Sequence, residues 1–303
     1  MKIVECRNLT KRYNGRNILD EMSFSIEENT ITGLIGRNGV GKTTLLKIIA
    51  GFIKELSGEM RVFGEKPFNS LNVSVNSIFV DDAMSIPPAL QLKEVLDAAG
   101  KFYPNWNATL ATRLFDYFSF EPWQYHNRLS KGKTSTFNAI IGLAARCPLT
   151  IFDEPTTGMD EAARRDFYRA LLKDYIAHPR TIILSSHHIE EMEDILEDIL
   201  LLKGGKAYLH LPMTELVKWG IAIKGPANSV RKLIENREIV HQKQIGSHSL
   251  YAVIKNDLSL DEQQEAYLSG LELTPVHTSD LFIYLTNETI GGIDDVFINN
   301  ESD

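Results

Sequence analysis

Eight consecutive residues near the amino terminus have the types and spacing that bind phosphate groups. They satisfy the pattern G-x-x-x-x-G-K-[ST] and lie between a strand-like segment and a helix-like one. Glycines let successive backbone N–H groups turn inward around phosphates, and the following helix adds the positive end of its dipole. The residues are Gly36, Arg37, Asn38, Gly39, Val40, Gly41, Lys42 and Thr43.

Three side chains at the end of this loop are suited to a triphosphate. Lys42 supplies a point charge for the terminal phosphates, Thr43 offers a hydroxyl to Mg²⁺, and Thr44 places a further hydroxyl near the α-phosphate. The loop therefore predicts a binding site for a nucleoside triphosphate. By itself it does not distinguish kinases, GTPases and ATPases.

Two adjacent acids follow a second strand-like segment. Residues 149–152 are typical of a buried strand, and Asp153 and Glu154 come directly after them. Asp153 can hold Mg²⁺ through water, and Glu154 can polarise the water that attacks a phosphate. The alternative is that the two acids cap the next helix. With a phosphate-binding loop upstream, we favour a hydrolytic site.

The elements that must position these residues alternate between strands and helices. Strands are expected at 30–35, 149–152 and 181–184, and helices at 42–50, 162–175 and 189–197. Such alternation indicates an α/β domain with a mostly parallel sheet. The strand-like segments before residue 30 predict an added antiparallel β layer, and residues 88–145 are expected to form a helical subdomain.

The pattern changes near residue 217, and a second, smaller domain is expected after it. Its strands and helices are expected in the order strand, helix, strand, strand, helix, strand, at 219–224, 227–236, 239–244, 249–255, 260–268 and 271–276. This is the β-α-β-β-α-β order of ferredoxin-like domains. We therefore expect a P-loop ATPase domain at 1–217, a small α+β domain at 218–290 and a flexible acidic tail at 291–303.

Charge and composition argue against several classes of protein. The net charge is −8, and eleven acidic residues but no Lys or Arg occur from Asn256 to Asp303, which disfavours nucleic-acid binding there. No apolar run reaches the roughly 20 residues of a membrane-spanning helix, and no secretory signal is evident. The two cysteines, Cys6 and Cys147, are far apart and predict inert thiols in a reducing cytosol.

Further short motifs resemble those of the ABC transporter ATPase family over residues 2–211. Tyr13 is similar to the family's aromatic residue that stacks on adenine. The segment Leu129-Ser130-Lys131-Gly132-Lys133 is similar to the signature LSGGQ. In that family the signature of one subunit closes over the ATP held by another. The resemblance therefore implies that Ser130, Lys131 and Gly132 contact this ATP in trans, with Ser130 and Gly132 at its γ-phosphate.

Two more motifs complete the resemblance. Asp160 lies in a segment similar to the D-loop, which places it at the dimer seam. His187 corresponds to the switch histidine that holds the γ-phosphate and the attacking water, while the neighbouring His188 is expected to be structural. In the order and at the separations found, the motifs are highly specific for the family.

Two segments depart from the family. A Gln normally lies about forty residues after the P-loop lysine, where it touches Mg²⁺, and Asp82 is the candidate for that position here. An aspartate can still bind Mg²⁺ but adds a charge. In the signature, Lys131 and Lys133 replace Gly and Gln; they either attract the facing phosphates or are simply solvated.

The aromatic-rich residues 102–125 are expected to pack in the helical subdomain and to line a groove for a permease helix.

The resemblance implies an ATPase that uses ATP and Mg²⁺ and forms a homodimer, or a heterodimer with a second ABC ATPase. Integral membrane permease subunits would carry out the transport, with export as the expected direction, and the chain would be cytoplasmic and peripheral on the inner face of the cell membrane. Segments such as 102–107 and 142–146 resemble the GntR-linked, Ytr-type group of Gram-positive bacteria. A soluble ABC protein of ribosomes or nucleic acid and a non-hydrolysing sensor are the rival interpretations.

Overall fold

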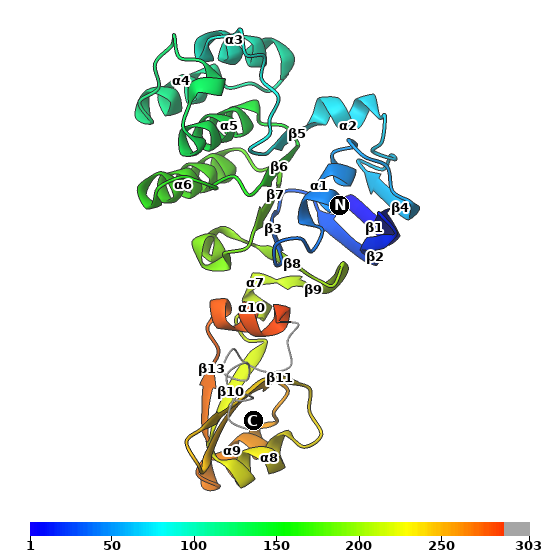
Figure 1. Ribbon diagram of the computed structural model, residues 1–303, viewed down its shortest axis with the longest axis vertical. Helices are drawn as coiled ribbons and strands as arrows, with labels where there is room; N and C mark the ends of the chain where they lie inside the picture. The colour runs from blue at the N-terminus through cyan, green and yellow to red at the C-terminus, as the bar shows by residue number, and fades with distance from the viewer. Residues whose placement is uncertain (288–303) are drawn as a thin grey trace, which may run out of the picture. The chain divides into compact units, whose positions relative to one another are not determined.

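The chain folds into two units, residues Met1–Thr214 and a second unit that starts at Glu215. The computed structural model describes residues 1–287 (Figure 1). No helix within those residues is long and apolar enough to cross a membrane. The tail expected at 291–303 lies outside the described residues.

A six-stranded sheet forms the centre of the first unit. In spatial order its strands are β5 (Ser77–Val80), β6 (Leu149–Asp153), β7 (Thr181–Ser186), β3 (Ile31–Ile35), β8 (Asp198–Lys203) and β9 (Lys206–Pro212). All neighbours are parallel except β8 and β9. Every residue of β3, β6 and β7 is buried, which is typical of parallel strands covered on both faces. The segments that follow these three strands therefore meet at one edge of the sheet.

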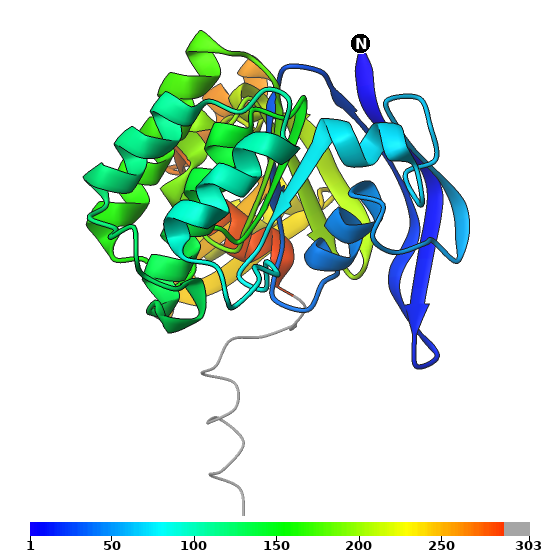
Figure 2. The same cartoon turned by 90° about the horizontal axis from the view of Figure 1, so that it is seen from above.

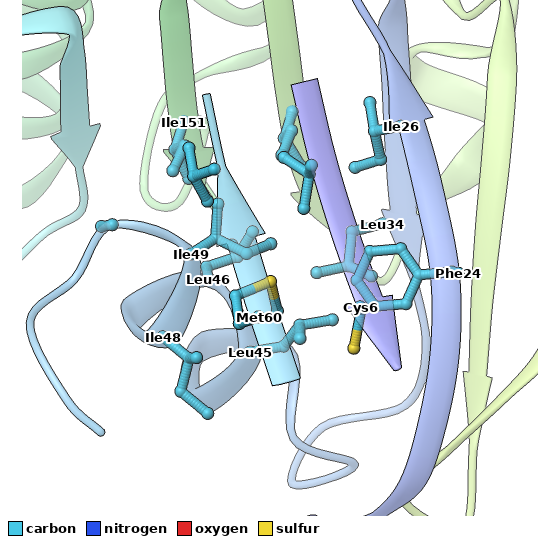
Figure 3. Close-up of a cluster of buried hydrophobic side chains, with 14 of the residues drawn as sticks. Cys6, Phe24, Ile26, Leu34, Leu45, Leu46, Ile48, Ile49, Met60 and Ile151 are labelled. Carbon is cyan, nitrogen blue, oxygen red and sulfur yellow. The ribbon is translucent and has the colours of Figure 1, made fainter. Parts of the chain in front are cut away.

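An antiparallel layer covers part of this sheet, as expected. Its strands are, in order, β2 (Arg16–Glu27), β1 (Lys2–Tyr13) and β4 (Ser57–Val62), and helix α1 (Lys42–Ile49) packs with them. Leu45, Leu46 and Ile49 of α1 share one buried cluster with Met60 of β4 and Ile151 of β6 (Figure 3). This cluster fixes the helix that begins at the phosphate-binding lysine.

Helices gather on the other side of the central sheet, where Figure 2 shows them in teal and green opposite the blue antiparallel strands. They are α3 (Leu92–Phe102), α4 (Ala108–Tyr117), α5 (Lys131–Ala145) and α6 (Glu161–Ala177), with a 3₁₀ turn, η1 (His126–Arg128), before α5. The short helix α2 (Leu71–Asn76) precedes β5 and packs through Val73 with the cluster around α1. The rings of Phe115, Phe120 and Phe137 lie with centroids 5.5 to 6.3 Å apart. These aromatic residues form a packed core, while Tyr117 and Trp123 stay exposed.

The prediction of an acidic helix at 189–197 is wrong. Two 3₁₀ turns replace it, η2 (Ile189–Glu191) and η3 (Glu193–Ile195). Buried apolar side chains recur at every third position, at Ile189, Met192 and Ile195. This repeat matches the three residues per turn of a 3₁₀ helix better than the 3.6 of an α-helix.

The second unit has the expected order of strands and helices. They are β10 (Gly220–Pro226), α8 (Ala227–Ile234), β11 (Ile239–Ile245), β12 (Ser249–Lys255), α9 (Leu260–Leu268) and β13 (Glu272–Pro275). The sheet is antiparallel with the order β11-β12-β10-β13, and Ile223, Ile254 and Val230 are among its core residues. Two short helices, α7 (Met213–Leu216) and α10 (Thr278–Thr286), were not expected.

Candidate functional site

The phosphate-binding loop connects β3 to α1, as its sequence predicts. Gly39 and Gly41 have φ angles of 82° and 110°, in the left-handed region that L side chains rarely adopt. A Cβ on Gly41 would also lie only 2.9 Å from the Ile18 carbonyl oxygen. The backbone path of the loop therefore requires glycine at both positions.

The side chains of the loop divide into one buried cation and several exposed groups. Lys42 is 5% exposed, and its Nζ donates to the Gly36 carbonyl oxygen at 2.8 Å. Thr43 is exposed at the first turn of α1, and Thr44 is half-buried. Arg37 and Asn38 are exposed at the tip of the loop, whereas Val40 is half-buried. The ammonium group is thus held under the loop, where bound phosphates would face it.

The two acids after β6 are fixed by a serine of the neighbouring strand. The Ser185 hydroxyl at the end of β7 donates to Asp153 Oδ1 at 2.6 Å and accepts a hydrogen bond from the Glu154 backbone N–H at 2.9 Å. Glu154 has a φ of 49°, a left-handed conformation that is uncommon for a non-glycine residue. The serine and the turn together direct the two carboxylates differently: Asp153 is buried and Glu154 is partly exposed.

Lys42, Glu154 and His187 meet at the sheet edge. Glu154 Oε1 lies 3.2 Å from Lys42 Nζ, and its Oε2 lies 3.4 Å from His187 Nδ1. His187 Nδ1 is buried and makes no hydrogen bond of good geometry among the described residues. His188 is exposed, and its ring centroid lies 4.1 Å from that of His187. Segments far apart in the sequence therefore bring together a phosphate-binding cation, a carboxylate and an imidazole.

The signature residues begin helix α5. Ser130 is its N-cap and accepts from the Lys133 backbone N–H at 3.3 Å. A Cβ on Gly132 would lie 2.2 Å from the Gly158 carbonyl oxygen, so glycine is required for this contact with the loop before α6. Asp160 is the N-cap of α6 and accepts from the Ala163 N–H at 2.8 Å. The signature and the D-loop are thus packed against each other.

Both lysines of the signature have partners inside the chain. Lys133 Nζ donates to the Phe118 and Ser119 carbonyl oxygens at the end of α4 and lies 4.7 Å from the Phe120 ring centroid. Lys131 Nζ lies 3.7 Å from Asp82 Oδ2, with both side chains largely exposed. Neither lysine is simply solvated, and of the two only Lys131 keeps a largely exposed side chain.

The turn after β5 carries a second carboxylate whose role the sequence did not reveal. Asp81 is partly buried, and burial raises its pKa; the Lys47 charge opposes this rise, and the Asp153 and Asp82 charges add to it. Asp82 is exposed and faces Lys131. Asp81 thus lies within electrostatic reach of the Asp153 carboxylate, and its position directly after a strand of the same sheet is the signal that could have singled it out.

Tyr13 ends β1 and is separate from the Lys42, Glu154 and His187 group. Its ring is 45% exposed, and Lys11 Nζ lies 5.3 Å from the ring centroid. An exposed ring with this placement remains free to stack on a ligand. A cavity of about 250 Å³ adjoins the catalytic candidates and is lined by Glu154, His187 and Arg164, among others.

Known proteins resemble this chain over about two thirds of its length, and one resembles it over nearly the whole length. A family profile described as ABC transporter matches residues 19–157. The ABC transporter ATP-binding protein YtrB of Bacillus subtilis is 26% identical over 287 residues, covering 93% of this chain and 97% of that protein. An uncharacterized ABC transporter ATP-binding protein of Methanocaldococcus jannaschii is 31% identical over 206 residues, covering 67% and 75%. A dimeric ATP-binding cassette solved in a post-hydrolysis state with ADP and Pi shares the fold, with a TM-score of 0.61 and 22% identity, covering 69% and 98%.

Proposed function

The chain belongs to the family of ABC transporter ATP-binding proteins, and we propose from that premise that it hydrolyses ATP at a site centred on Glu154. The observation that carries the proposal is the position of the Glu154 carboxylate, 3.2 Å from Lys42 and 3.4 Å from His187. Because Lys42 belongs to the phosphate-binding loop, this carboxylate lies beside the place of the terminal phosphate. There it can orient a water molecule for attack on phosphorus, with ADP as the leaving group.

The remaining residues of the loop hold the nucleotide. Backbone N–H groups at 36–41 surround the phosphates, with Arg37, Asn38 and Val40 contributing only their main chain, and Thr44 contacts the α-phosphate. The exposed ring of Tyr13 stacks on adenine. His187 contacts the γ-phosphate and the attacking water, which keeps both in line with the Glu154 carboxylate.

The site fits Mg²⁺. Mg²⁺ is usually held by one or two carboxylates together with substrate phosphates rather than by a protein cage, and the described residues contain no group of three or more His, Cys, Asp or Glu that could hold a metal. Thr43 and Asp153 are the residues that would hold it, and Asp82 is a further candidate. The ion would neutralise charge that develops on the phosphate oxygens.

The active form is a dimer in which each ATP lies between two subunits. Ser130, Lys131 and Gly132 begin α5 at an exposed or half-exposed surface, where they can contact a nucleotide bound by the partner. Asp160 caps α6 next to them and is assigned to the dimer seam. A single complete set of motifs permits a homodimer, and a heterodimer with a second ABC ATPase is the alternative.

Transport itself requires separate permease subunits. The likeness to YtrB along nearly the whole chain supports a place in the GntR-linked, Ytr-type group, and export is the direction we propose. The chain would then lie in the cytoplasm on the inner face of the membrane, bound to its permease. Residues 1–217 would form the ATPase domain, with residues 88–145 as its permease-contacting subdomain, and residues 218–290 the accessory domain.

Trapping of the dimer tests the nucleotide site. Glu154→Gln keeps the shape of the side chain but cannot polarise water, so this variant should form a stable dimer with ATP and Mg²⁺ in size-exclusion chromatography. Lys42→Ala combined with Glu154→Gln should remain monomeric because the phosphates lose their buried cation. A monomer in both variants at millimolar ATP would contradict the proposed site.

Affinity purification tests the partner. The tagged Glu154→Gln variant, extracted from membranes in detergent with ATP, should retain a hydrophobic multi-span protein. Recovery of ribosomes in its place would contradict the assignment to a transporter.

A further inference from the structure

We propose that Arg164 is a positioning residue for His187, acting through Glu191, and that α6 is the common support for both catalytic side chains. The proposal rests on the proposed function of Glu154 and His187. It assigns a role to three side chains that none of the recognised motifs contains: Arg164, Tyr168 and Glu191.

Arg164 lies one turn after the residue that caps α6. Its backbone N–H donates to the Asp160 carbonyl oxygen at 3.0 Å, so the α-helix is regular up to the D-loop. The Arg164 guanidinium forms an ion pair with the Glu191 carboxylate through Nη1 and Oε1. The two side chains are only 32% and 22% exposed, and ion pairs removed from solvent hold geometry better than fully exposed ones.

Glu191 lies in the segment that carries His187. It ends η2, four residues after the histidine, and the Met192 N–H donates back to the Ile189 carbonyl oxygen to close that turn. On the other side, the Ser186 hydroxyl accepts from the His188 N–H at 2.9 Å. The histidine is thus held between the end of β7 and a turn that Arg164 ties to α6.

The same face of α6 also reaches the segment after Glu154. Tyr168, one turn beyond Arg164, is buried, and its hydroxyl lies near the side chain of Thr156, two residues after Glu154; burial raises the pKa of this phenol to about 12. Residues four apart project from one side of a helix. One rigid element therefore fixes the turn that carries Glu154 and the turn that carries His187.

The cavity next to Glu154 and His187 leaves these side chains room to move, which the Arg164–Glu191 ion pair would restrict. Arg164, Glu191, Glu154 and His187 all line the same space of about 250 Å³. Open space beside a side chain permits it to move, and the Glu154–His187 distance of 3.4 Å has no well-formed hydrogen bond to hold it. The Arg164–Glu191 ion pair is the side-chain contact that ties the segment carrying His187 to α6 and so limits its movement.

Kinetics of matched arginine variants test the proposal. Arg164→Gln should lower kcat for ATP by on the order of 10- to 100-fold, because small displacements of a catalytic group cost rate of this size, while KM for ATP changes less than about threefold. Arg169→Gln is the control, since Arg169 lies on the same helix in an exposed ion pair with Asp166. Arg164→Lys should recover part of the lost kcat, because it restores the charge.

A double-mutant cycle tests the route through Glu191. Glu191→Gln should reproduce the loss in kcat, and the double variant with Arg164→Gln should be no worse than either single one, because the two residues act as a unit. Additive losses in kcat, or an Arg164→Gln variant with wild-type kcat, would overturn the proposal.

Hydrogen exchange provides a readout that does not depend on hydrolysis. In Arg164→Gln without nucleotide, the amides of 187–192 should exchange faster than in the wild type, with those of α5 unchanged. Unchanged exchange at 187–192 would also overturn the proposal, even in a protein that hydrolyses ATP. If the wild type had no ATPase activity but residues 187–192 still exchanged faster in Arg164→Gln than in the wild type, the proposed function would be contradicted. The positioning contact would still be supported.

Discussion

The Lys131 ammonium lies 3.7 Å from the Asp82 carboxylate, so the first residue of α5 is paired with the turn that follows β5. Asp82 and Lys131 belong to the two segments in which the sequence departs from the family pattern, and they contact each other. Both side chains are more than half exposed, and such ion pairs add little to folding stability. We therefore expect the two charges to affect nucleotide binding more than folding stability.

Replacement of Asp82 tests what this contact does. Asp82→Asn should strengthen ATP-dependent dimerisation by about two- to fivefold, an effect typical of exposed charge pairs, because Lys131 is freed to attract the phosphates of the partner's ATP. The measurement is the ATP concentration for half-maximal dimerisation in sedimentation velocity, made in the Glu154→Gln background. The gain should vanish when Lys131→Met is added. With Glu154 intact, an Asp82→Asn variant that needs at least tenfold more Mg²⁺ for hydrolysis would instead identify Asp82 as a metal-binding residue.

Lys133 should matter for stability rather than for phosphate binding. Its ammonium group satisfies carbonyl oxygens at the end of α4, where the helix dipole favours a cation. Lys133→Met should therefore lower the free energy of unfolding by about 1 kcal/mol, measured by urea denaturation. Lys131→Met, which removes an exposed charge, should leave it nearly unchanged. Equal losses in both variants would contradict this distinction.

Ser185 should be needed for turnover although it touches no substrate. Its hydroxyl fixes the Asp153 carboxylate and the Glu154 backbone at once. In Ser185→Ala, both acids lose that support, and we expect kcat to fall by roughly tenfold or more. Ser185→Thr, which keeps the hydroxyl, should retain more activity. Wild-type kcat in Ser185→Ala would show that the turn alone positions the acids.

A buried ion triad should dominate the stability of the first unit. Asp174 of α6 accepts from Arg146 at 2.6 Å and from Arg180 at 2.8 Å, and its side chain is only 4% exposed. Asp174→Asn leaves two arginines without their counter-charge, so the free energy of unfolding should fall by about 3–5 kcal/mol. Denaturation of Asp166→Asn, on a more exposed part of α6, provides the comparison. A loss below about 1 kcal/mol would contradict this role.

The parts that sequence predicted best are those in which function depends on consecutive residues. The phosphate-binding loop needs its glycines at fixed spacing, so its position between strand and helix could be predicted and is confirmed. The contacts of Ser185 and Arg164 could not be predicted, because their partners lie 32 and 27 residues away and depend on how neighbouring elements pack. Glu154, by contrast, is recognisable because it follows a buried strand directly.

The features that the sequence predicted wrongly or left open also have physical causes. At 189–197 the acidic residues suggested a solvated helix, whereas the buried residues recur every third position and select 3₁₀ turns. The two lysines of the signature looked alike, yet one caps a helix and the other faces a carboxylate. Tertiary partners, which the chain order does not reveal, decide between such alternatives.

Steady-state release of inorganic phosphate is the most direct test of the central role of Glu154. The wild type should release phosphate from ATP in the presence of Mg²⁺, and Glu154→Gln should reduce that rate by on the order of 100-fold or more, with ATP binding retained in an equilibrium measurement. Equal rates in both proteins, whether near zero or at wild-type level, would contradict hydrolysis at this carboxylate.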